Sequence, residues 1–438
     1  MAASLNHPNI EMLATSSLTP NSHNARAHSD KQIRQIAANI RRFGFLGALI
    51  IDGDSNTIFA GNGRWKAAEL VGLKEVPCIR AKFLTEADRR AFALADNRLS
   101  ELSSWDPEIL SAELDFVFES GFDINTIGFS TADLNFAIVD EAEKPAKIDN
   151  VELPNPCVAA VSRLGDLWIA GPHRLYCGDA RQVTSWEALL GDDRAQLIFA
   201  DAPFNVPING HVSGTGRHRE FVAASGELTA PEFTTFLRQA FRNCVRFSVD
   251  GSIHYHVMDW RHSREILDAA DGVYHEFKQL VVWAKTNAGM GTFYRSRHEL
   301  VFVFKAGKGK HINNFGLGER GRYRTNVVEY AGANTFRKGR KEDLDAHSTV
   351  KPTALVADFI LDCSNRSDLV VDPFVGSGTT LIAAHRTKRR GAGMELDPLY
   401  VDTALRRLAK VTTLTPVLAG DGRTFDEIAI ARGVKQEA

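Results

Sequence analysis

The sequence predicts an α/β protein with two domains: a large parallel sheet covered by helices, preceded by a small α+β domain. From residue 164 onward, apolar runs of strand length alternate with helical stretches, which favours a parallel sheet. At residues 369–381 a strand, a glycine-rich turn and a helix follow one another directly. In the first third the strand and helix signals alternate on a shorter period, and 438 residues are more than one core ordinarily holds.

The composition is that of a globular protein, with 44% hydrophobic and 24% charged residues. The apolar runs are too short to span a membrane, and the N-terminus lacks the layout of a signal peptide. We therefore expect a cytoplasmic protein with no membrane partner. The five cysteines form no C-x-x-C pair, so we predict neither a disulfide framework nor a metal site.

The small domain opens with a helix and a hairpin. The helix should begin behind Ser29 or Asp30 and end near Gly44, because apolar residues between these positions recur at helical spacing. Residues 48–51 and 57–60 should form the two strands of the hairpin, since the turn residues Asp, Gly, Ser and Asn separate them.

The rest of the small domain continues the alternation. A loop at residues 61–64 precedes a short helix at 65–71, a strand at 76–79 and a longer helix over 85–102.

Residues 140–156 combine charged side chains, prolines and little periodicity, so we predict a linker there. It would separate a domain over residues 1–139, which ends in a helical extension, from a domain over residues 157–438.

An apolar strand at residues 197–200 is followed by Asp201-Ala202-Pro203-Phe204. Ligands of open α/β sheets bind at the carboxyl ends of strands, so these side chains should lie at a site. A fixed carboxylate that accepts an N–H of an exocyclic amine would make that amine a better nucleophile, and an aromatic ring could stack on a base taken out of a duplex. Taken alone, the segment also fits a strand that ends in a turn, with Phe204 in the core.

The glycine-rich turn contains Gly376 and Gly378 and leads into a helix whose N-terminus favours a carboxylate or phosphate. Leu381 stands where dinucleotide-binding proteins have a third glycine, and the Gly-Lys-Ser/Thr ending of a phosphate loop is absent from the sequence. Glu395 would end the next strand, where an acid commonly holds ribose hydroxyls. A nucleoside ligand without phosphates therefore fits better than NAD or ATP.

Four short segments can be compared with known motifs. Residues 201–204 are D-A-P-F, residues 374–378 are F-V-G-S-G, residues 347–352 are H-S-T-V-K-P, and residues 177–179 are C-G-D. They resemble the D-P-P-Y, F-x-G-x-G, K-P and G-D motifs of the β group of DNA N6-adenine and N4-cytosine methyltransferases, in the permuted order of that group. The resemblance implies a Rossmann-like, S-adenosylmethionine-dependent methyltransferase domain.

The resemblance also implies a role for each matching residue. Asp201 and Pro203 would hold the target amine and Phe204 would stack on the base, which makes these three the expected catalytic residues. The expected cofactor-binding residues are Asp179, Lys351, Phe374, Gly376, Gly378, Thr379 and Glu395. Ala202 stands where the family motif has its first proline.

The activity implied is site-specific methylation of a flipped base in double-stranded DNA. Asp at the start of the catalytic motif favours adenine N6, because the N4-cytosine enzymes of the family more often begin this motif with Ser. N4-cytosine methylation, or RNA as the substrate, is the alternative. The resemblance leaves open a homodimer and a restriction endonuclease partner.

Between residues 295 and 341 there are twelve Lys or Arg residues against three Glu. Such an excess attracts phosphates if it is exposed. The β group carries target recognition in this region, so we expect the target-recognition segment at about residues 295–345, although a solvated charged loop would look the same. The expected DNA-binding residues are Arg320, Arg322, Arg324, Arg337, Lys338 and Arg340.

The first third resembles the ParB and sulfiredoxin-like domain, most clearly at Gly61-Asn62-Gly63-Arg64. In that family a glycine-arginine segment meets nucleotide phosphates, because an arginine at a helix start adds a bidentate donor to free backbone N–H groups. The resemblance therefore implies that Gly61, Gly63 and Arg64 bind a nucleotide or phosphate. A structural or DNA-docking role is the alternative.

Two classes of function follow. The first is a DNA methyltransferase with an auxiliary ParB-like module. The second is a ParB-like DNA-binding or regulatory protein whose methyltransferase domain is degenerate because of Ala202. The joint presence of Asp201, Phe204, Gly376 and Glu395 favours the enzyme, and transfer of labelled methyl groups to DNA would discriminate between the two.

Overall fold

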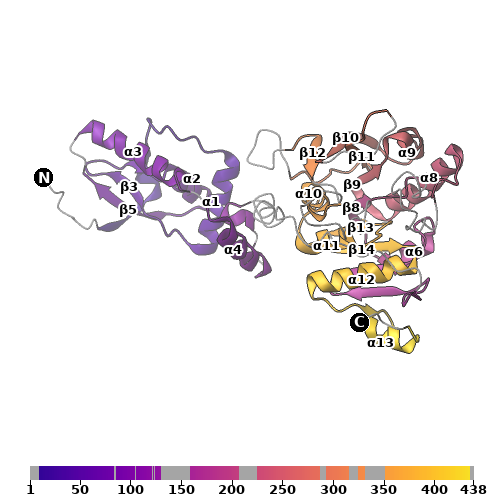
Figure 1. The fold of residues 1–438 in the computed structure, drawn as a ribbon. Coiled ribbons are helices and arrows are strands. Elements are labelled where there is room, and N and C mark those ends of the chain that lie inside the picture. Colours follow the sequence, from indigo (N-terminus) through magenta and orange to yellow (C-terminus); the bar gives the residue numbers. More distant parts are fainter. Residues whose placement is uncertain are drawn as a thin grey trace, which may run out of the picture. The chain divides into compact units, whose positions relative to one another are not determined.

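The structure, a computed structural model, describes residues 9–82, 85–103, 105–120, 122, 124–129, 158–206, 224–286, 293–314, 324–330 and 351–434. The chain divides into two compact units, Met1–Ala137 and Ile138–Ala438 (Figure 1). The linker predicted at residues 140–156 lies outside the described residues.

The described part of the first unit contains a five-stranded sheet and four α-helices. The strands, in spatial order, are β1 (Ile10–Ala14), β5 (Glu75–Ala81), β3 (Leu49–Asp52), β4 (Thr57–Ala60) and β2 (Thr19–Pro20). The helices are α1 (Asp30–Phe43), α2 (Asn62–Val71), α3 (Glu86–Glu101) and α4 (Pro107–Glu119), with 3-10 turns at Thr15–Ser17 and Ile124–Ile127.

Local residues set the boundaries of α1. The hydroxyl of Ser29 accepts the backbone N–H of Gln32 at 3.2 Å, and Gly44 ends the helix with a φ of 86°. Ala37 and Ile40 bury one face of the helix in a small cluster that includes part of α2. The predicted helix is confirmed, and so is the predicted hairpin, because β3 and β4 pair antiparallel.

α2 begins three residues earlier than the sequence predicted, at Asn62. Gly61 precedes it with a φ of 99°, a conformation that L side chains rarely adopt. The carbonyl of Gly61 accepts the backbone N–H of Trp65 at 3.0 Å, so the first helical turn already includes the glycine-rich loop.

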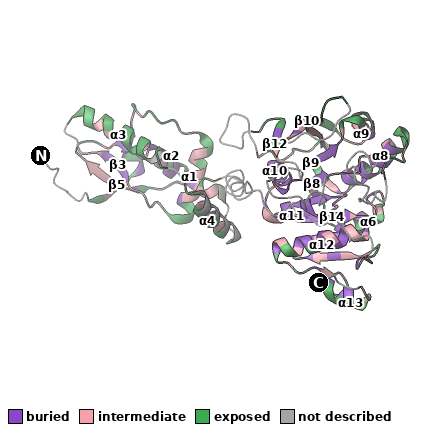
Figure 2. Ribbon diagram, in the orientation of Figure 1, coloured by how far each residue is buried: buried purple, intermediate pink, exposed green. Residues whose placement is uncertain are grey.

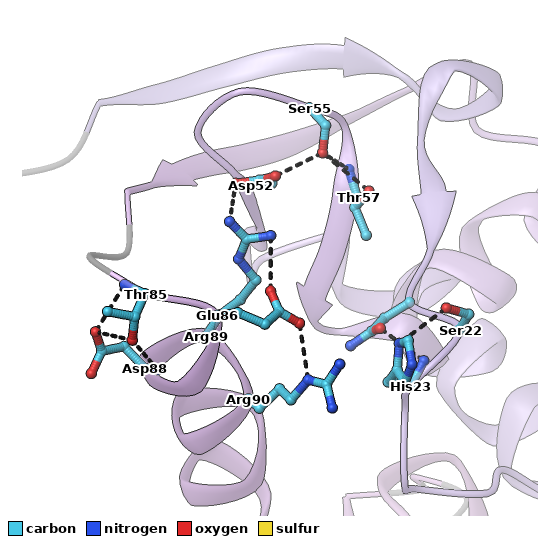
Figure 3. A network of polar contacts seen from close by, with 11 residues as sticks. Ser22, His23, Asp52, Ser55, Thr57, Thr85, Glu86, Asp88, Arg89 and Arg90 are labelled. Carbon is cyan, nitrogen blue, oxygen red and sulfur yellow. Dashed lines mark hydrogen bonds and ion pairs between the residues drawn. The ribbon is translucent and has the colours of Figure 1, made fainter.

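Ion pairs connect α3 to the end of β3 (Figure 3). The guanidinium of Arg89 lies 3.8 Å from Asp52 and 3.2 Å from Glu86. Thr85 and Asp88 form a reciprocal capping box at the start of the helix. Partly exposed pairs of this kind contribute at most about 1 kcal/mol each, so they add little to the stability of the unit.

The described part of the second unit contains a ten-stranded sheet. Its strands, in spatial order, are β12 (Val327–Tyr330), β10 (Glu276–Lys285), β11 (His298–Lys305), β9 (Ser248–Met258), β8 (Ala195–Ala200), β13 (Leu369–Asp372), β14 (Arg390–Glu395), β7 (His173–Cys177), β6 (Leu167–Ala170) and β15 (Val417–Leu418). Its α-helices are α6 (Val183–Leu190), α8 (Ala230–Arg246), α9 (Ser263–Ala270), α10 (Thr353–Cys363), α11 (Thr379–Arg386), α12 (Pro398–Thr412) and α13 (Phe425–Ala431). The predicted α/β class is confirmed.

The central strands are covered on both faces and are largely buried (Figure 2). Leu197 and Phe199 of β8 pack in a cluster with α10, whereas Ile198 and Ala200 pack in a cluster with α6. Successive residues of a strand point to opposite faces, so α10 and α6 lie on opposite sides of the sheet.

The directions of the strands decide where a site can form. The neighbouring strands β9, β8, β13, β14 and β7 are all parallel, so their carboxyl ends meet at one edge, called here the carboxyl edge. Asp201 directly follows β8, while Asp372 and Glu395 end β13 and β14. β11 is antiparallel to β9, so β11 begins at the carboxyl edge, and β10 ends there.

No helix in the described part of the chain is long and apolar enough to cross a membrane. The four cysteines that the structure describes, Cys78, Cys177, Cys244 and Cys363, are buried and form no disulfide. Their burial agrees with a packing role.

Candidate active site

Asp201 lies at the carboxyl edge, directly after β8. The Nζ atom of Lys351 lies 2.8 Å from its Oδ2 atom. The Asp201 side chain is 25% exposed, whereas that of Lys351 is only 7% exposed. A buried cation therefore holds the carboxylate, which remains accessible to a ligand.

The contact between Asp201 and Lys351 belongs to a longer series of charges. Lys351 also lies 3.2 Å from Glu299 of β11, and Glu299 pairs with Lys285 at the end of β10. These four residues, called here the charge row, alternate in sign. Neutralisation by a partner is what allows charges to stay in an environment with little water.

The charge row shifts the pKa values of its members. Burial raises the pKa of Asp201 above its ordinary value, and Glu299 adds to this, while the charge of Lys351 opposes it. Burial alone would lower the pKa of Lys351, but Asp201 and Glu299 together raise it. Lys351 is therefore a permanent cation, and Asp201 binds a proton more readily than an exposed aspartate does.

Asn205 holds the loop that carries Phe204. Its φ of 53° lies in the left-handed region, which asparagine tolerates better than most residues. Its side-chain amide donates to the carbonyl of Leu228 at 2.8 Å, and its side-chain oxygen accepts two backbone N–H groups. The centroid of the partly buried Phe204 ring lies 5.4 Å from Nζ of Lys351, so this ring stands in the neighbourhood of Asp201.

Two carboxylates hold the glycine-rich turn after β13. Asp372 accepts the backbone N–H of Phe374 at 2.9 Å and the hydroxyl of Thr380. Glu395 accepts the backbone N–H of Gly376 at 3.0 Å. Burial raises the pKa of both carboxyl groups to about 7.

The two glycines of this turn are there for different reasons. A Cβ atom on Gly376, whose φ is +51°, would have no neighbour closer than the carbonyl oxygen of Phe374 at 4.0 Å. A Cβ atom on Gly378, whose φ is +86°, would lie 3.1 Å from the Cβ atom of Ala404 on α12. Gly376 therefore borders open space. Close packing against α12 is sufficient to account for a glycine at position 378, so no bound ligand is needed to explain it.

Two other residues expected at the cofactor have partners within the protein. The hydroxyl of Thr379 accepts a hydrogen bond from Arg407 of α12 at 2.8 Å, and this residue is 7% exposed. The ring of Phe374 stacks on Phe236 of α8, with 6.2 Å between the centroids. Their direct role in the structure is to attach the turn to the neighbouring helices.

Asp179 follows β7, which pairs with β14, and it therefore lies next to the end of β14. The N–H of Gly178 donates to the carbonyl of Glu395 at 2.9 Å. The carboxylate of Asp179 is bound by the guanidinium of Arg181 at 2.7 Å, and this guanidinium lies 5.0 Å from the centroid of the Phe236 ring.

The carboxyl edge thus brings most of the predicted site residues into one row. β8, β13, β14 and β7 are successive strands, so Asp201, Gly376, Glu395 and Asp179 follow one another along the edge. One end offers an accessible carboxylate beside an aromatic ring. The other offers carboxylates around a turn that borders open space. Such a site can polarise an amine at one end and hold the hydroxyls of a nucleoside at the other.

Sequence reasoning missed Glu299 and Lys285. A charged residue at the end of an apolar strand is common, and only the register of the hairpin, which pairs Trp283 with Glu299, brings the two side chains together. Lys351, expected at the cofactor, contacts the carboxylate of Asp201, which is the expected catalytic residue.

Arg324 faces the interior of the second unit. Its guanidinium lies 2.6 Å from Asp358 and 3.1 Å from Asp362, both on α10, and its side chain is 16% exposed. These two carboxylates already neutralise it, and a contact between Arg324 and DNA stays a prediction. The other predicted DNA-binding residues lie outside the described residues: Arg320, Arg322, Arg337, Lys338 and Arg340.

Gly61, Gly63 and Arg64 lie at the start of α2 in the first unit. A Cβ atom on Gly61 would lie 3.2 Å from the Arg64 guanidinium, and one on Gly63 would lie 2.9 Å from the ring of His28. Burial lowers the pKa of Arg64, and Asp96 opposes this shift. Internal packing thus explains both glycines, and phosphate binding here stays a prediction.

Two family models match the chain. The DNA methylase model matches residues 195–406, and the ParB N-terminal domain model matches residues 1–98. The first match contains both the strand end at Asp201 and the glycine-rich turn.

Among curated proteins, the chain is similar to the type II methyltransferase M.HpaI of Haemophilus parainfluenzae and to M.HinfI of Haemophilus influenzae. It is 26% identical to the first over 255 residues, which are 54% of this chain and 74% of that protein. It is 26% identical to the second over 237 residues, which are 50% of this chain and 64% of that protein.

Solved structures similar to the chain include the M1.HpyAVI–SAM complex, with a TM-score of 0.40, 20% identity, and coverage of 54% of this chain and 98% of that one. They also include the C-terminally truncated chromosome-partitioning protein ParB from Caulobacter crescentus complexed with CTP-gamma-S, with a TM-score of 0.27, 18% identity, and coverage of 31% of this chain and 81% of that one.

Proposed function

We propose that this chain, which joins a ParB N-terminal domain to a domain of the DNA methylase family, transfers a methyl group from S-adenosylmethionine to N6 of an adenine flipped out of double-stranded DNA. The observation that carries the proposal is the accessible carboxylate of Asp201, held by buried Lys351 at the same sheet edge as the glycine-rich turn.

Asp201 would act on the target amine. The lone pair of an exocyclic amine is delocalised into the base, so the amine is a poor nucleophile. A carboxylate that accepts one of its N–H groups increases electron density on nitrogen and stabilises the positive charge that develops as the N–C bond forms. The raised pKa of Asp201 also suits it to take the proton that the methylated amine releases.

Phe204 would hold the base that carries the amine. Its ring lies near the Asp201–Lys351 pair, and Asn205 fixes the loop behind it. An aromatic face can stack on any base removed from the duplex.

The residues around the turn fit a nucleoside cofactor. Open space at Gly376 admits a ligand close to the backbone, and Glu395 and Asp179 offer carboxylate oxygens for hydroxyl and amino groups. S-adenosylmethionine bound there would supply an electrophilic methyl group. The residues of the turn would hold it, and those around Asp201 would orient the amine toward it.

The choice of adenine rests on Asp at the start of the catalytic segment. N4-cytosine methylation is the alternative target. The substitution of the family's first proline by Ala202 does not favour a degenerate site, because Ala202 is 4% exposed and packs in a hydrophobic cluster while Asp201 keeps its partner Lys351.

The test is expression of the full chain in a host that lacks DNA methylation, followed by sequencing with detection of modified bases. We expect N6-methyladenine in one sequence context with the natural chain and a strongly reduced level of it with Asp201→Ala. Detection of N4-methylcytosine would instead identify cytosine N4 as the target. Unmodified DNA, together with purified protein that transfers no labelled methyl group to DNA, would refute it.

A further inference from the structure

Two adjacent aromatic side chains project into solvent. Phe293 is 88% exposed and Tyr294 is 83% exposed, more than any other aromatic residue in the described part of the chain. Their rings contact each other edge to face, with centroids 4.7 Å apart. Side chains that bury so little surface in the protein do not stabilise its fold, and a pair of them indicates contact with another molecule.

This pair lies at the carboxyl edge of the sheet. It belongs to the connection between β10 and β11, and the pairing of Leu300 with Met258 sets the start of β11 beside the end of β9. β9 is parallel to β8, whose end precedes Asp201. The connection therefore leaves the sheet at the same edge as the proposed catalytic carboxylate.

Hydrogen bonds and an ion pair connect the two ends of the β10–β11 connection to the charge row. The N–H of Lys285 donates to the carbonyl of Arg297 at 2.8 Å, and the Arg297 guanidinium donates back to the carbonyl of Lys285 at 2.7 Å. Lys285 pairs with Glu299, which contacts Lys351 and through it Asp201. The aromatic pair thus projects from a support that is continuous with the site.

The charge around the pair favours DNA as the partner. Arg295 directly follows Tyr294 and is exposed, and Arg297 lies two residues further on. Cations beside aromatic rings match a polyanion whose bases offer flat apolar faces. Removal of a base from the duplex costs a few kcal/mol of stacking and pairing free energy and leaves a gap between its former neighbours. An apolar side chain can fill this gap.

We propose that Phe293 and Tyr294 insert into the duplex beside the flipped base and stack on its former neighbours, which stabilises the extruded state. This inference rests on the proposed function. It assigns the pair to opening the duplex and leaves the methyl-transfer step to the residues around Asp201.

The test compares substrates that differ in the free energy needed to remove the target base from its stack. The double variant Phe293→Ala/Tyr294→Ala is assayed on a short duplex containing the modified sequence, on the same duplex with an abasic position opposite the target, and on the single strand. Phe293→Trp keeps a flat ring and should act like the natural chain. Ile430→Ala, at a 78% exposed position on α13, is the control for loss of exposed apolar surface.

We expect the double variant to lose about tenfold or more of its rate on the paired duplex, as loss of base–aromatic stacking predicts, and to stay within about threefold of the natural chain on the other two substrates. Its affinity for S-adenosylmethionine, measured by calorimetry, should not change.

Two results would overturn the inference alone: an unchanged rate on the paired duplex, or an equal loss on all three substrates. An unchanged rate together with a smaller species in sedimentation would assign the pair to contact between two copies of the chain. A natural chain that methylates none of the substrates would instead overturn the proposed function, and the inference with it.

Discussion

Nζ of Lys351 lies 2.8 Å from Oδ2 of Asp201, and the same ammonium lies 3.2 Å from Glu299. One buried cation is thus shared between the proposed catalytic carboxylate and a second carboxylate from another strand. The ionisation of Asp201 depends on both neighbours, because Lys351 lowers its pKa and Glu299 raises it. Substitutions of the two neighbours should therefore have opposite effects.

Asp201→Ala should fold and bind S-adenosylmethionine nearly normally, yet methylate on the order of 100- to 1000-fold more slowly, because a charge-assisted acceptor at the reacting amine is lost. Asp201→Asn should be almost as damaging, since its amide can present a donor where an acceptor is needed. Single-turnover kinetics on the DNA and cofactor calorimetry separate the two effects. A near-normal rate for Asp201→Ala would place the chemistry elsewhere.

Lys351→Met should shift the acid limb of the rate profile to higher pH. Removal of the cation that lowers the pKa of Asp201 raises that pKa further, so a smaller fraction of Asp201 is ionised at a given pH. Activity lost at a given pH should then partly recover as the pH is raised. Unfolding by urea, measured alongside, identifies any loss that arises from leaving Asp201 without its ion-pair partner.

Glu299→Gln should shift the same limb to lower pH. It removes a negative charge that raises the pKa of Asp201 and keeps the size of the side chain, while Lys351 retains Asp201 as its partner. Lys285 loses its carboxylate partner but is 25% exposed and can be hydrated. Acid limbs that move in the same direction in both variants would contradict control of Asp201 by the charge row.

Substitutions at Gly376 and Gly378 should distinguish effects on S-adenosylmethionine binding from effects on the free energy of unfolding. Gly376→Ala and Gly378→Ala both add a Cβ atom at positive φ, which costs roughly 1–2 kcal/mol. Only the second meets Ala404 of α12, so it should lower the free energy of unfolding more. Gly376→Val should weaken S-adenosylmethionine binding at least tenfold, about 1.4 kcal/mol, because the side chain enters the open space. Unchanged affinity in a folded Gly376→Val protein would remove this turn from the cofactor site.

Arg324→Met should destabilise the second unit by about 3–5 kcal/mol, because it leaves Asp358 and Asp362 buried without their cation. It should not change the dependence of DNA binding on salt, which reports phosphate contacts. Arg264→Met is the matched control, since this 90% exposed arginine also pairs with an aspartate and its loss should matter little. A flatter salt dependence with Arg324→Met would instead support the predicted contact between Arg324 and DNA.

Features with local causes could be predicted from the sequence. Ser29 and Gly44 mark the ends of α1 because a cap and a positive φ depend on neighbouring residues. The motifs around Asp201 and Gly376 led to the family for the same reason, since each is a short segment with its own geometry.

Features that depend on the order of strands could not be predicted. Glu299 reaches Lys351 only because β11 lies next to β9, which lies next to β8. The local excess of Lys and Arg likewise does not indicate where the Arg324 side chain points, because its orientation depends on two aspartates of α10. A glycine is needed at position 378 because α12 packs closely against the turn, and this contact exists only in the folded protein.

The pairing of Leu197 with Val370 joins β8 to β13 across most of the sequence of the second unit. The two halves of the site are therefore made at very different times during synthesis on the ribosome. A product that terminates before β13 contains Asp201 but lacks the glycine-rich turn, and such long-range strand pairing is also slow to form. The proposed methylation should thus begin only after β13 and the glycine-rich turn have been synthesised and have paired with β8.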